Sequence, residues 1–147
     1  MCVAGGEGVT CPFGCLGCDC NSPDTPIATP TGDRAIATLR AGDLVYSIDG
    51  SAIVAVPILL AVENPVHGHH VVRLRLSNGV TLEISANHPL ADGRTIGQLA
   101  GGDSYEDAHI EATERIPYAP AATFDILPSS STGIYFAAGL PLRSTLR

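Results

Sequence analysis

Cysteine is absent from residues 21–147 of this 147-residue chain, because all five cysteines lie at its beginning. A disulfide scaffold normally spreads its cysteines so that each bridge closes a loop. An odd number of cysteines also leaves at least one thiol unpaired. The sequence therefore does not have the pattern of a disulfide-stapled fold, and we expect a reducing compartment, the cytoplasm by default. The five residues are Cys2, Cys11, Cys15, Cys18 and Cys20.

Long hydrophobic runs and basic charge are also scarce. No apolar run approaches the ~20 residues that span a bilayer. The start, "MCVAGGEGVTCPFG", has neither the basic nor the apolar region of a signal peptide. Eight basic residues against fifteen acidic ones give a net charge of −7, which disfavours binding to a nucleic-acid backbone. We expect a monomeric globular protein without a membrane or nucleic-acid partner.

Apolar and polar residues alternate in the sequence, which is the pattern of β-strands. Residues 71–85, "VVRLRLSNGVTLEIS", alternate on both sides of Asn78-Gly79, a pair favoured in two-residue type I′ hairpin turns. Residues 44–56 repeat this arrangement around Asp49-Gly50. Eleven prolines and sixteen glycines argue against long helices, so the sequence predicts an all-β protein. The residues expected on the buried face of the first hairpin are Leu74, Leu76, Leu82 and Ile84.

One short segment occurs twice, sixty residues apart. "RAIATLRAGD" (34–43) matches "RTIGQLAGGD" (94–103) at both ends and at its Ile and Leu positions. Each copy is typical of one helical turn whose Ile and Leu face inward, followed by a Gly-Asp turn. The repeat predicts two related β halves with a cleft between them.

Three further blocks follow one another in a characteristic order. The first starts at Cys20, has Thr25 five residues later and continues through "PIATPTG" to the first repeat. The second is "SANHPL" (85–90), and the third is Phe124-Asp125-Ile126 leading into "GIYFAAG". In order and spacing the sequence resembles the Hint domain, the self-processing module shared by hedgehog proteins and inteins. The resemblance implies a horseshoe-like all-β fold with pseudo-two-fold symmetric halves, of the bacterial intein-like type.

The resemblance divides the chain and selects one cysteine. Residues 1–19 would be a Cys- and Gly-rich leader, and residues 20–147 the self-processing domain. Cys20 is the only cysteine with a Thr five residues downstream. Its thiol would attack the carbonyl of Asp19 in an N–S acyl shift, which breaks the 19–20 amide and leaves a thioester. The implied activity is that of a single-turnover cysteine autoprotease that acts on its own upstream polypeptide and needs no cofactor.

The resemblance also assigns supporting roles. His88 would polarise the scissile amide and give a proton to the leaving nitrogen. Ser85, in the place of the family's Thr, would hold the amide or the imidazole. It lacks the methyl group that restricts χ1, so its orientation is expected to be looser. Asp125 would accept the thiol proton or orient the next nucleophile, and the carboxylate of Asp19 offers a route for attack on the thioester.

Two departures from the family pattern bear on how the thioester is resolved. The stretch "GLPLRSTLR" contains no His-Asn pair of the kind that completes splicing by cyclisation. Ala138 also stands where the family pattern has Asn. We therefore expect the thioester to be hydrolysed, or captured by an external small nucleophile, rather than to proceed to full splicing.

Other interpretations remain open at this stage. The domain could be a processing-inactive Hint-like structural or binding module. The cysteines upstream of Cys20 could hold zinc, although a clean second C-x2-C pair is missing. His88 could simply fill a turn, and Asp125 could face solvent, opposite to its apolar neighbours. The residues of the alternative zinc site are Cys11, Cys15 and Cys18, and the residues interpreted as surface histidines are His67, His69 and His70.

Overall fold

The computed structural model of the protein describes residues 3–5, 8–10 and 20–146, and these form β-strands joined by turns. β1 (Val3–Gly5) and β2 (Gly8–Thr10) make a small hairpin. In the described part of the chain, no helix has the length and apolar character needed to cross a lipid bilayer. The remaining strands are β3 (Pro26–Ile27), β4 (Arg34–Ala35), β5 (Leu44–Asp49), β6 (Ala52–Pro65), β7 (His70–Leu76), β8 (Thr81–Ile84), β9 (Ser104–Tyr105), β10 (Ala108–Pro117), β11 (Ala122–Pro128), β12 (Ile134–Ala137) and β13 (Leu140–Arg143).

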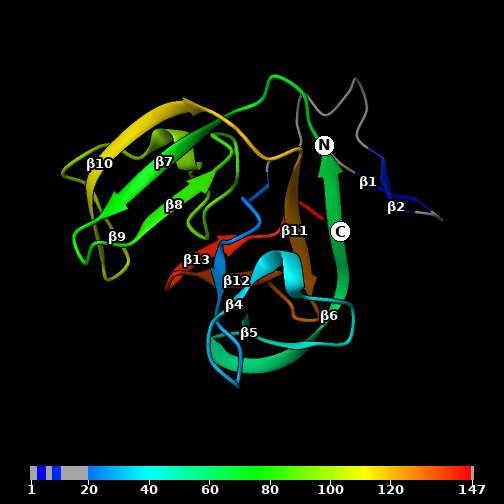
Figure 1. The fold of residues 1–147 in the computed structure, drawn as a ribbon. Helices are drawn as coiled ribbons and strands as arrows, with labels where there is room; N and C mark the ends of the chain where they lie inside the picture. The colour runs from blue at the N-terminus through cyan, green and yellow to red at the C-terminus, as the bar shows by residue number, and fades with distance from the viewer. Residues whose placement is uncertain (1–2, 6–7, 11–19, 147) are drawn as a thin grey trace.

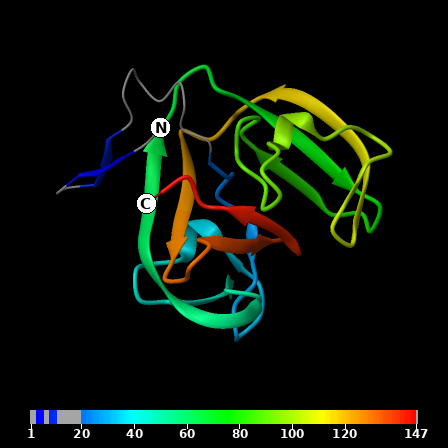
Figure 2. The ribbon, with the colours of Figure 1, turned by 180° about the vertical axis from the view of Figure 1, so that it is seen from behind.

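The strands form two lobes that curl around a shared hydrophobic core (Figures 1 and 2). One lobe is the sheet β8-β7-β10-β9. The other combines the sheets β11-β6-β5 and β13-β12-β3-β4. Buried residues of both lobes, such as Leu74 in β7 and Ile126 in β11, belong to the same core cluster. The prediction of an all-β fold is therefore confirmed.

The repeated segment adopts the same structure in both halves. Each copy forms a short 3-10 helix, η1 (Ile36–Thr38) in the first and η2 (Ile96–Gln98) in the second. In both, the Leu amide that follows the helix donates to the carbonyl of its first Ile at 3.1 Å. The four apolar side chains are buried, as the repeat predicts: Ile36, Leu39, Ile96 and Leu99.

The Gly-Asp pair of each repeat closes a matching turn. Gly42 and Gly102 both have φ of +94°, a conformation that residues with a Cβ rarely adopt. The amide of Gly42 donates to the carbonyl of Ile58, and the amide of Gly102 donates to the carbonyl of Ile110, each at 2.8 Å. The pseudo-two-fold relation between the halves thus extends from sequence to individual hydrogen bonds.

Two hairpins have the predicted strands but different turns. The carbonyl of Leu76 accepts the amide of Gly79, and the amide of Leu76 donates to the carbonyl of Val80. The loop of the first hairpin is therefore Ser77–Gly79, and within it only Gly79 has a positive φ. A three-residue loop of this kind needs Gly at its last position rather than an Asn-Gly type I′ pair. The two-residue turn predicted around Asn78-Gly79 is therefore wrong in type, although the buried face of this hairpin is confirmed.

The second hairpin is shifted by one residue from the prediction. Asp49 pairs with Ala52, so the loop consists of Gly50 and Ser51 instead of Asp49 and Gly50. Asp49 stays in the strand because its carboxylate accepts the amide of Ser131 at 2.7 Å. This contact joins two turns that are far apart in sequence, which a local pattern does not reveal.

The turn between β12 and β13 contains Ala138, where the sequence departs from the Hint pattern. Ala138 and Gly139 have φ of +49° and +83°, the signs of a type I′ turn. Asn is preferred over Ala at such a position, because Ala in a left-handed conformation costs about 1–2 kcal/mol. The substitution at Ala138 therefore concerns the conformation of this turn.

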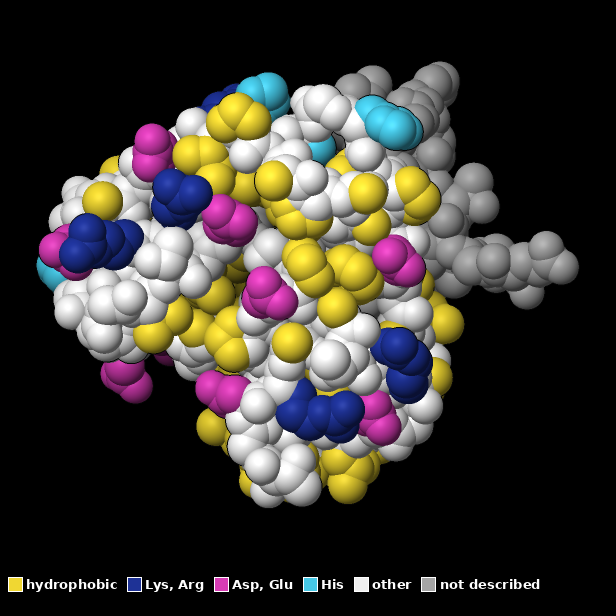
Figure 3. Space-filling model, in the orientation of Figure 1, with side chains coloured by type: hydrophobic (Ala, Val, Ile, Leu, Met, Phe, Trp, Pro, Cys, Tyr) yellow, Lys and Arg dark blue, Asp and Glu magenta, His cyan; other side chains and the backbone are white. Residues whose placement is uncertain are grey.

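Charged side chains of both signs mix on the surface. On the face shown in Figure 3, Arg side chains lie next to Asp and Glu side chains. In the lobe of β7, Arg73 forms ion pairs with Glu83 at 3.2 Å and with Glu114 at 3.8 Å. Such exposed pairs contribute little stability, typically about 0–1 kcal/mol.

Candidate active site

The segment that starts at Cys20 lies between the two lobes (Figure 1). Asn21 forms antiparallel bridges with Ile84 of β8 on one side and with Phe124 of β11 on the other. These bridges place Cys20 between Ser85 and Asp125, the neighbours of the two bridging residues. Cys20 is fully buried. The first residue of the predicted domain therefore enters the structure at the junction of its two halves.

The sulfur of Cys20 has a hydrogen-bond donor beside it. The side-chain amide of Asn64, near the end of β6, donates to Sγ at 3.0 Å. Asn64 is buried. A donor to sulfur stabilises the thiolate relative to the thiol. The sequence did not identify Asn64, because its only signal there is a polar residue within a long, mainly apolar segment.

Ser85 holds the peptide group of Cys20. Its Oγ accepts the backbone N–H of Cys20 at 3.3 Å and donates to the backbone carbonyl of Cys20 at 3.1 Å. The backbone nitrogen of Cys20 is the nitrogen of the 19–20 peptide bond. Of the two roles considered for Ser85, the structure brings it to the amide.

A histidine outside the predicted site reaches Ser85. His69 Nε2 lies 2.8 Å from Ser85 Oγ. Because the Ser85 hydroxyl hydrogen is used on the Cys20 carbonyl, the imidazole Nε2–H is the donor in this contact. Three hydrogen bonds thus fix the Ser85 hydroxyl, which offsets the rotational freedom left by the missing methyl group.

His69, interpreted from the sequence as a surface residue, is only partly exposed. Its side chain is partly buried, and its ring packs edge-on against Tyr118, with the ring centroids 5.7 Å apart. The alternation of apolar and polar residues in β7 does not predict the burial of His69, because β7 begins one residue later, at His70. His67 and His70 are exposed, as predicted.

His69 makes the stability of the fold depend on pH. Burial, and then the nearby His70, lower the pKa of His69 below its usual 6.5. The unfolded chain then binds the proton more tightly than the folded chain, so stability is lost as pH falls below about 6.5. We expect the urea concentration at the midpoint of unfolding to decrease as the pH is lowered from 8 to 5. In His69→Gln this decrease should be smaller. His67→Gln is the matched control, and equal slopes for His69→Gln and the wild type would refute the assignment.

His88 is tied to the Cys20 segment by two routes. Its backbone amide donates to the carbonyl of Ser85 at 3.1 Å, which closes the turn after β8. Its ring Nε2 lies 3.2 Å from the hydroxyl of Tyr135, and that hydroxyl accepts the Asn21 side-chain amide at 2.7 Å. His88 is fully buried. The imidazole is therefore linked, through Tyr135, to the side chain of the residue that follows Cys20.

Tyr135 determines which ring nitrogen of His88 carries hydrogen. The tyrosine has one hydroxyl hydrogen, and it is donated to Asp125 Oδ1 at 2.8 Å. Burial, reinforced by the Asp125 carboxylate, raises the pKa of Tyr135 well above its usual value, so the hydroxyl keeps this hydrogen. His88 Nε2 therefore donates to the tyrosine oxygen.

Asp125 is buried, so the alternative in which it faces solvent is wrong. Both faces of β11 are covered, and the carboxylate points into the molecule. Besides Tyr135, it accepts the backbone amide of Thr145 at 2.9 Å and the Thr145 hydroxyl at 2.5 Å. Asp125 thus links the His88 network to the segment that follows β13.

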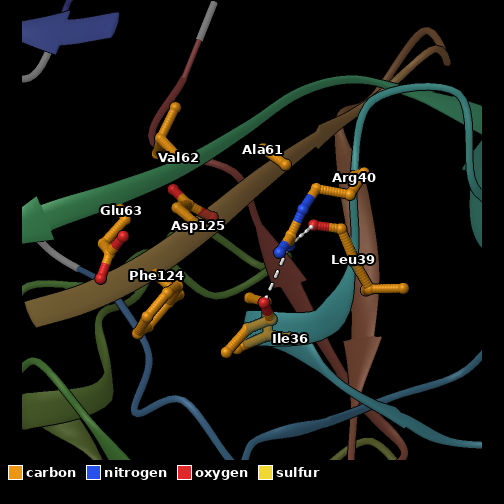
Figure 4. Close-up of a pocket in the computed structure, with 9 residues that line it drawn as sticks. Ile36, Leu39, Arg40, Ala61, Val62, Glu63, Phe124 and Asp125 are labelled. Carbon is orange, nitrogen blue, oxygen red and sulfur yellow. Dashed lines mark hydrogen bonds between the residues drawn. The ribbon is translucent and has the colours of Figure 1, made fainter.

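A surface pocket borders this network (Figure 4). It lies between η1 and the strands β6 and β11, and Asp125 is among its lining residues. The guanidinium of Arg40 donates to the carbonyls of Ala37 and Leu39, each at 2.9 Å. Neither Cys20 nor His88 lines this pocket, so it is adjacent to the candidate site and separate from it.

No protein family profile and no curated protein sequence matches the chain. Solved structures do. A bacterial intein-like domain from Clostridium thermocellum superposes with a TM-score of 0.71 at 18% identity, covering 86% of this chain and 97% of that domain. The MchDnaB-1 intein (N145AA) gives 0.68 at 22% identity, covering 85% and 99%. The gp41-1 intein gives 0.65 at 20%, covering 85% and 98%. The chain has the Hint fold of inteins.

Within this Hint fold, the four candidate residues of the described chain lie together. Cys20 and Ser85 share hydrogen bonds directly, while His88 and Asp125 meet through Tyr135. The remaining members of the network were not predicted: Asn21, Asn64, His69, Tyr135 and Thr145. Apart from Asn21, which directly follows Cys20, they lie far from Cys20 in sequence, so only the folded arrangement identifies them.

Asp19 and the alternative zinc ligands lie outside the residues that the structure describes. These ligands are Cys11, Cys15 and Cys18. Within the part of the chain that the structure describes, no group of three His, Cys, Asp or Glu side chains is arranged to hold a metal ion. The geometry above therefore concerns the thiol of Cys20 and its buried hydrogen-bond partners.

Proposed function

We propose that the domain breaks the peptide bond between Asp19 and Cys20 within its own precursor polypeptide. The observation that carries this proposal is the environment of Cys20. Its amide nitrogen bonds to the Ser85 hydroxyl, and its sulfur accepts a hydrogen bond from Asn64. Nitrogen and sulfur are the two atoms that exchange the acyl group in an N–S shift. A buried cysteine with a purely structural role would not need the donor at its sulfur.

The reaction balances without a cofactor. The Cys20 sulfur bonds to the carbonyl carbon of Asp19 as that carbon's bond to nitrogen breaks, and the thiol proton ends on the released amine. His88 accepts this proton and returns it to the nitrogen. Tyr135 and Asp125 hold Nε2 and favour the cationic ring between the two transfers. The intramolecular geometry reduces the entropic barrier to attack.

Release of the leader, rather than splicing, is the proposed outcome. The thioester would be resolved by water, by a small external thiol or by the neighbouring Asp19 carboxylate. Each of these ends the reaction after one turnover and leaves Cys20 as the new first residue of the domain.

Mass spectrometry after incubation with dithiothreitol tests the proposal. A polypeptide fused upstream should be released with Asp19 as its last residue, faster with added thiol than without it because the thiol exchanges with the thioester. Hydroxylamine should give the corresponding hydroxamate at Asp19. A folded protein whose mass stays intact under all these conditions would show that the domain serves as a structural module instead.

A further inference from the structure

Thr123 in β11 has a buried hydroxyl group that makes no hydrogen bond. Its side chain is fully buried, and its Oγ finds no partner among the described residues. A buried hydroxyl that makes no hydrogen bond destabilises a folded protein, so such groups are rare and call for a reason. The local structure supplies none, since a valine would fill the same space in the strand without this cost.

The position of Thr123 points to the candidate active site. In the register of β11 with β6, Thr123 stands directly opposite Asn64. Directly opposed residues of an antiparallel pair project to the same face with their Cβ atoms about 5 Å apart. The Asn64 side chain is the one that donates to the Cys20 sulfur. On its other side, Thr123 adjoins Phe124, whose backbone pairs with Asn21.

We infer that Thr123 and Asn64 form a donor pair for the negative charge that develops when Cys20 attacks the Asp19 carbonyl. This inference rests on the proposed function. The carbonyl oxygen is attached to the carbon that the sulfur attacks, so its charge develops beside the sulfur. Asn64 stabilises the sulfur before attack, and Thr123 donates its hydroxyl hydrogen to the oxygen during attack.

The absence of a partner in the resting state suits this role. A donor that is already held in place, and is not engaged elsewhere, needs no reorganisation when charge appears. The transition state then recovers a hydrogen bond that the ground state lacks, and only such differential interactions accelerate a reaction. Threonine supplies the donor on a rigid strand, with a β-branched side chain of restricted χ1.

The variants Thr123→Val and Thr123→Ser test the inference. Thr123→Val removes the hydroxyl and keeps the shape, so leader release should slow about 10²–10³-fold, the usual loss for one oxyanion donor. Its melting temperature should stay the same or rise, because no existing hydrogen bond is lost. Thr123→Ser should restore most of the rate. A structural role, for instance bonding to a buried water, predicts the opposite: a lower melting temperature and an unchanged rate.

Asn64 gives a measurement that does not depend on cleavage. In protein labelled with 13C at the cysteine Cβ, the Cys20 thiol can be titrated by NMR. Asn64→Leu should move its midpoint to higher pH, while Thr123→Val should leave it near the wild-type value. An unchanged midpoint in Asn64→Leu, or full activity in Thr123→Val, would overturn the donor pair alone. A wild-type chain that releases nothing would overturn the proposed function and this inference with it.

Discussion

Cys20→Ala is expected to abolish release of the segment that ends at Asp19. Without the sulfur no side chain can accept the acyl group, and uncatalysed peptide hydrolysis is too slow to detect on this timescale. Alanine is small enough to occupy the buried position, although the hydrogen bond from Asn64 is lost. The expected result is an intact mass after incubation with dithiothreitol, together with a cooperative unfolding transition. Release from a folded Cys20→Ala protein would contradict the role of this thiol.

Graded variants separate the chemistry of Cys20 from its packing. Cys20→Ser keeps an acceptor atom beside Asn64 but offers a hydroxyl, which is far less ionised than a thiol near neutral pH. Release should therefore be much slower than in the wild type, and dithiothreitol should accelerate it less because an ester exchanges poorly with thiols. The matched control replaces the three other nearby cysteines by serine, Cys11, Cys15 and Cys18, and should leave the rate unchanged.

The fold was largely predictable because its signals are local. Alternation between residues 71 and 85 determines which leucines are buried, since a shift by one residue would reverse both faces. The repeated Ile, Leu and Gly-Asp positions report the same 3-10 helix and turn in each half. The turn types were not predictable in the same way. They depend on register and on distant contacts, as the bond between Asp49 and Ser131 illustrates.

The site was predictable only in part, and for a physical reason. Cys20, Ser85 and His88 occur in short motifs with characteristic spacing. Asn64 and Tyr135 contribute through contacts with residues far from them in sequence. A polar residue in a strand has no sequence signature of the partner that it will meet. The inward orientation of Asp125 likewise depends on the layer that covers β11. Single-sequence reasoning therefore finds the reacting groups more readily than the residues that position them.

His88→Ala should slow release about 10²–10⁴-fold, the usual contribution of a general acid–base group. Tyr135→Phe should have a smaller effect, because the imidazole stays while the bridge to Asp125 is lost. Without the tyrosine oxygen, Nε2 is no longer fixed as the donor, and the cationic ring loses its link to the carboxylate. The pH–rate profile of Tyr135→Phe should therefore shift on its acidic side, which packing changes alone would not produce.

Tyr105→Phe is the matched control for Tyr135→Phe. Tyr105 is equally buried, and its hydroxyl accepts the Ala91 amide at 2.9 Å and donates to the Pro141 carbonyl. Both substitutions remove one buried hydroxyl, so each should destabilise the fold by about 1–3 kcal/mol. Only Tyr135→Phe removes a contact to His88. If the two variants slowed release equally and kept the wild-type pH profile, Tyr135 would support the fold without directing the imidazole.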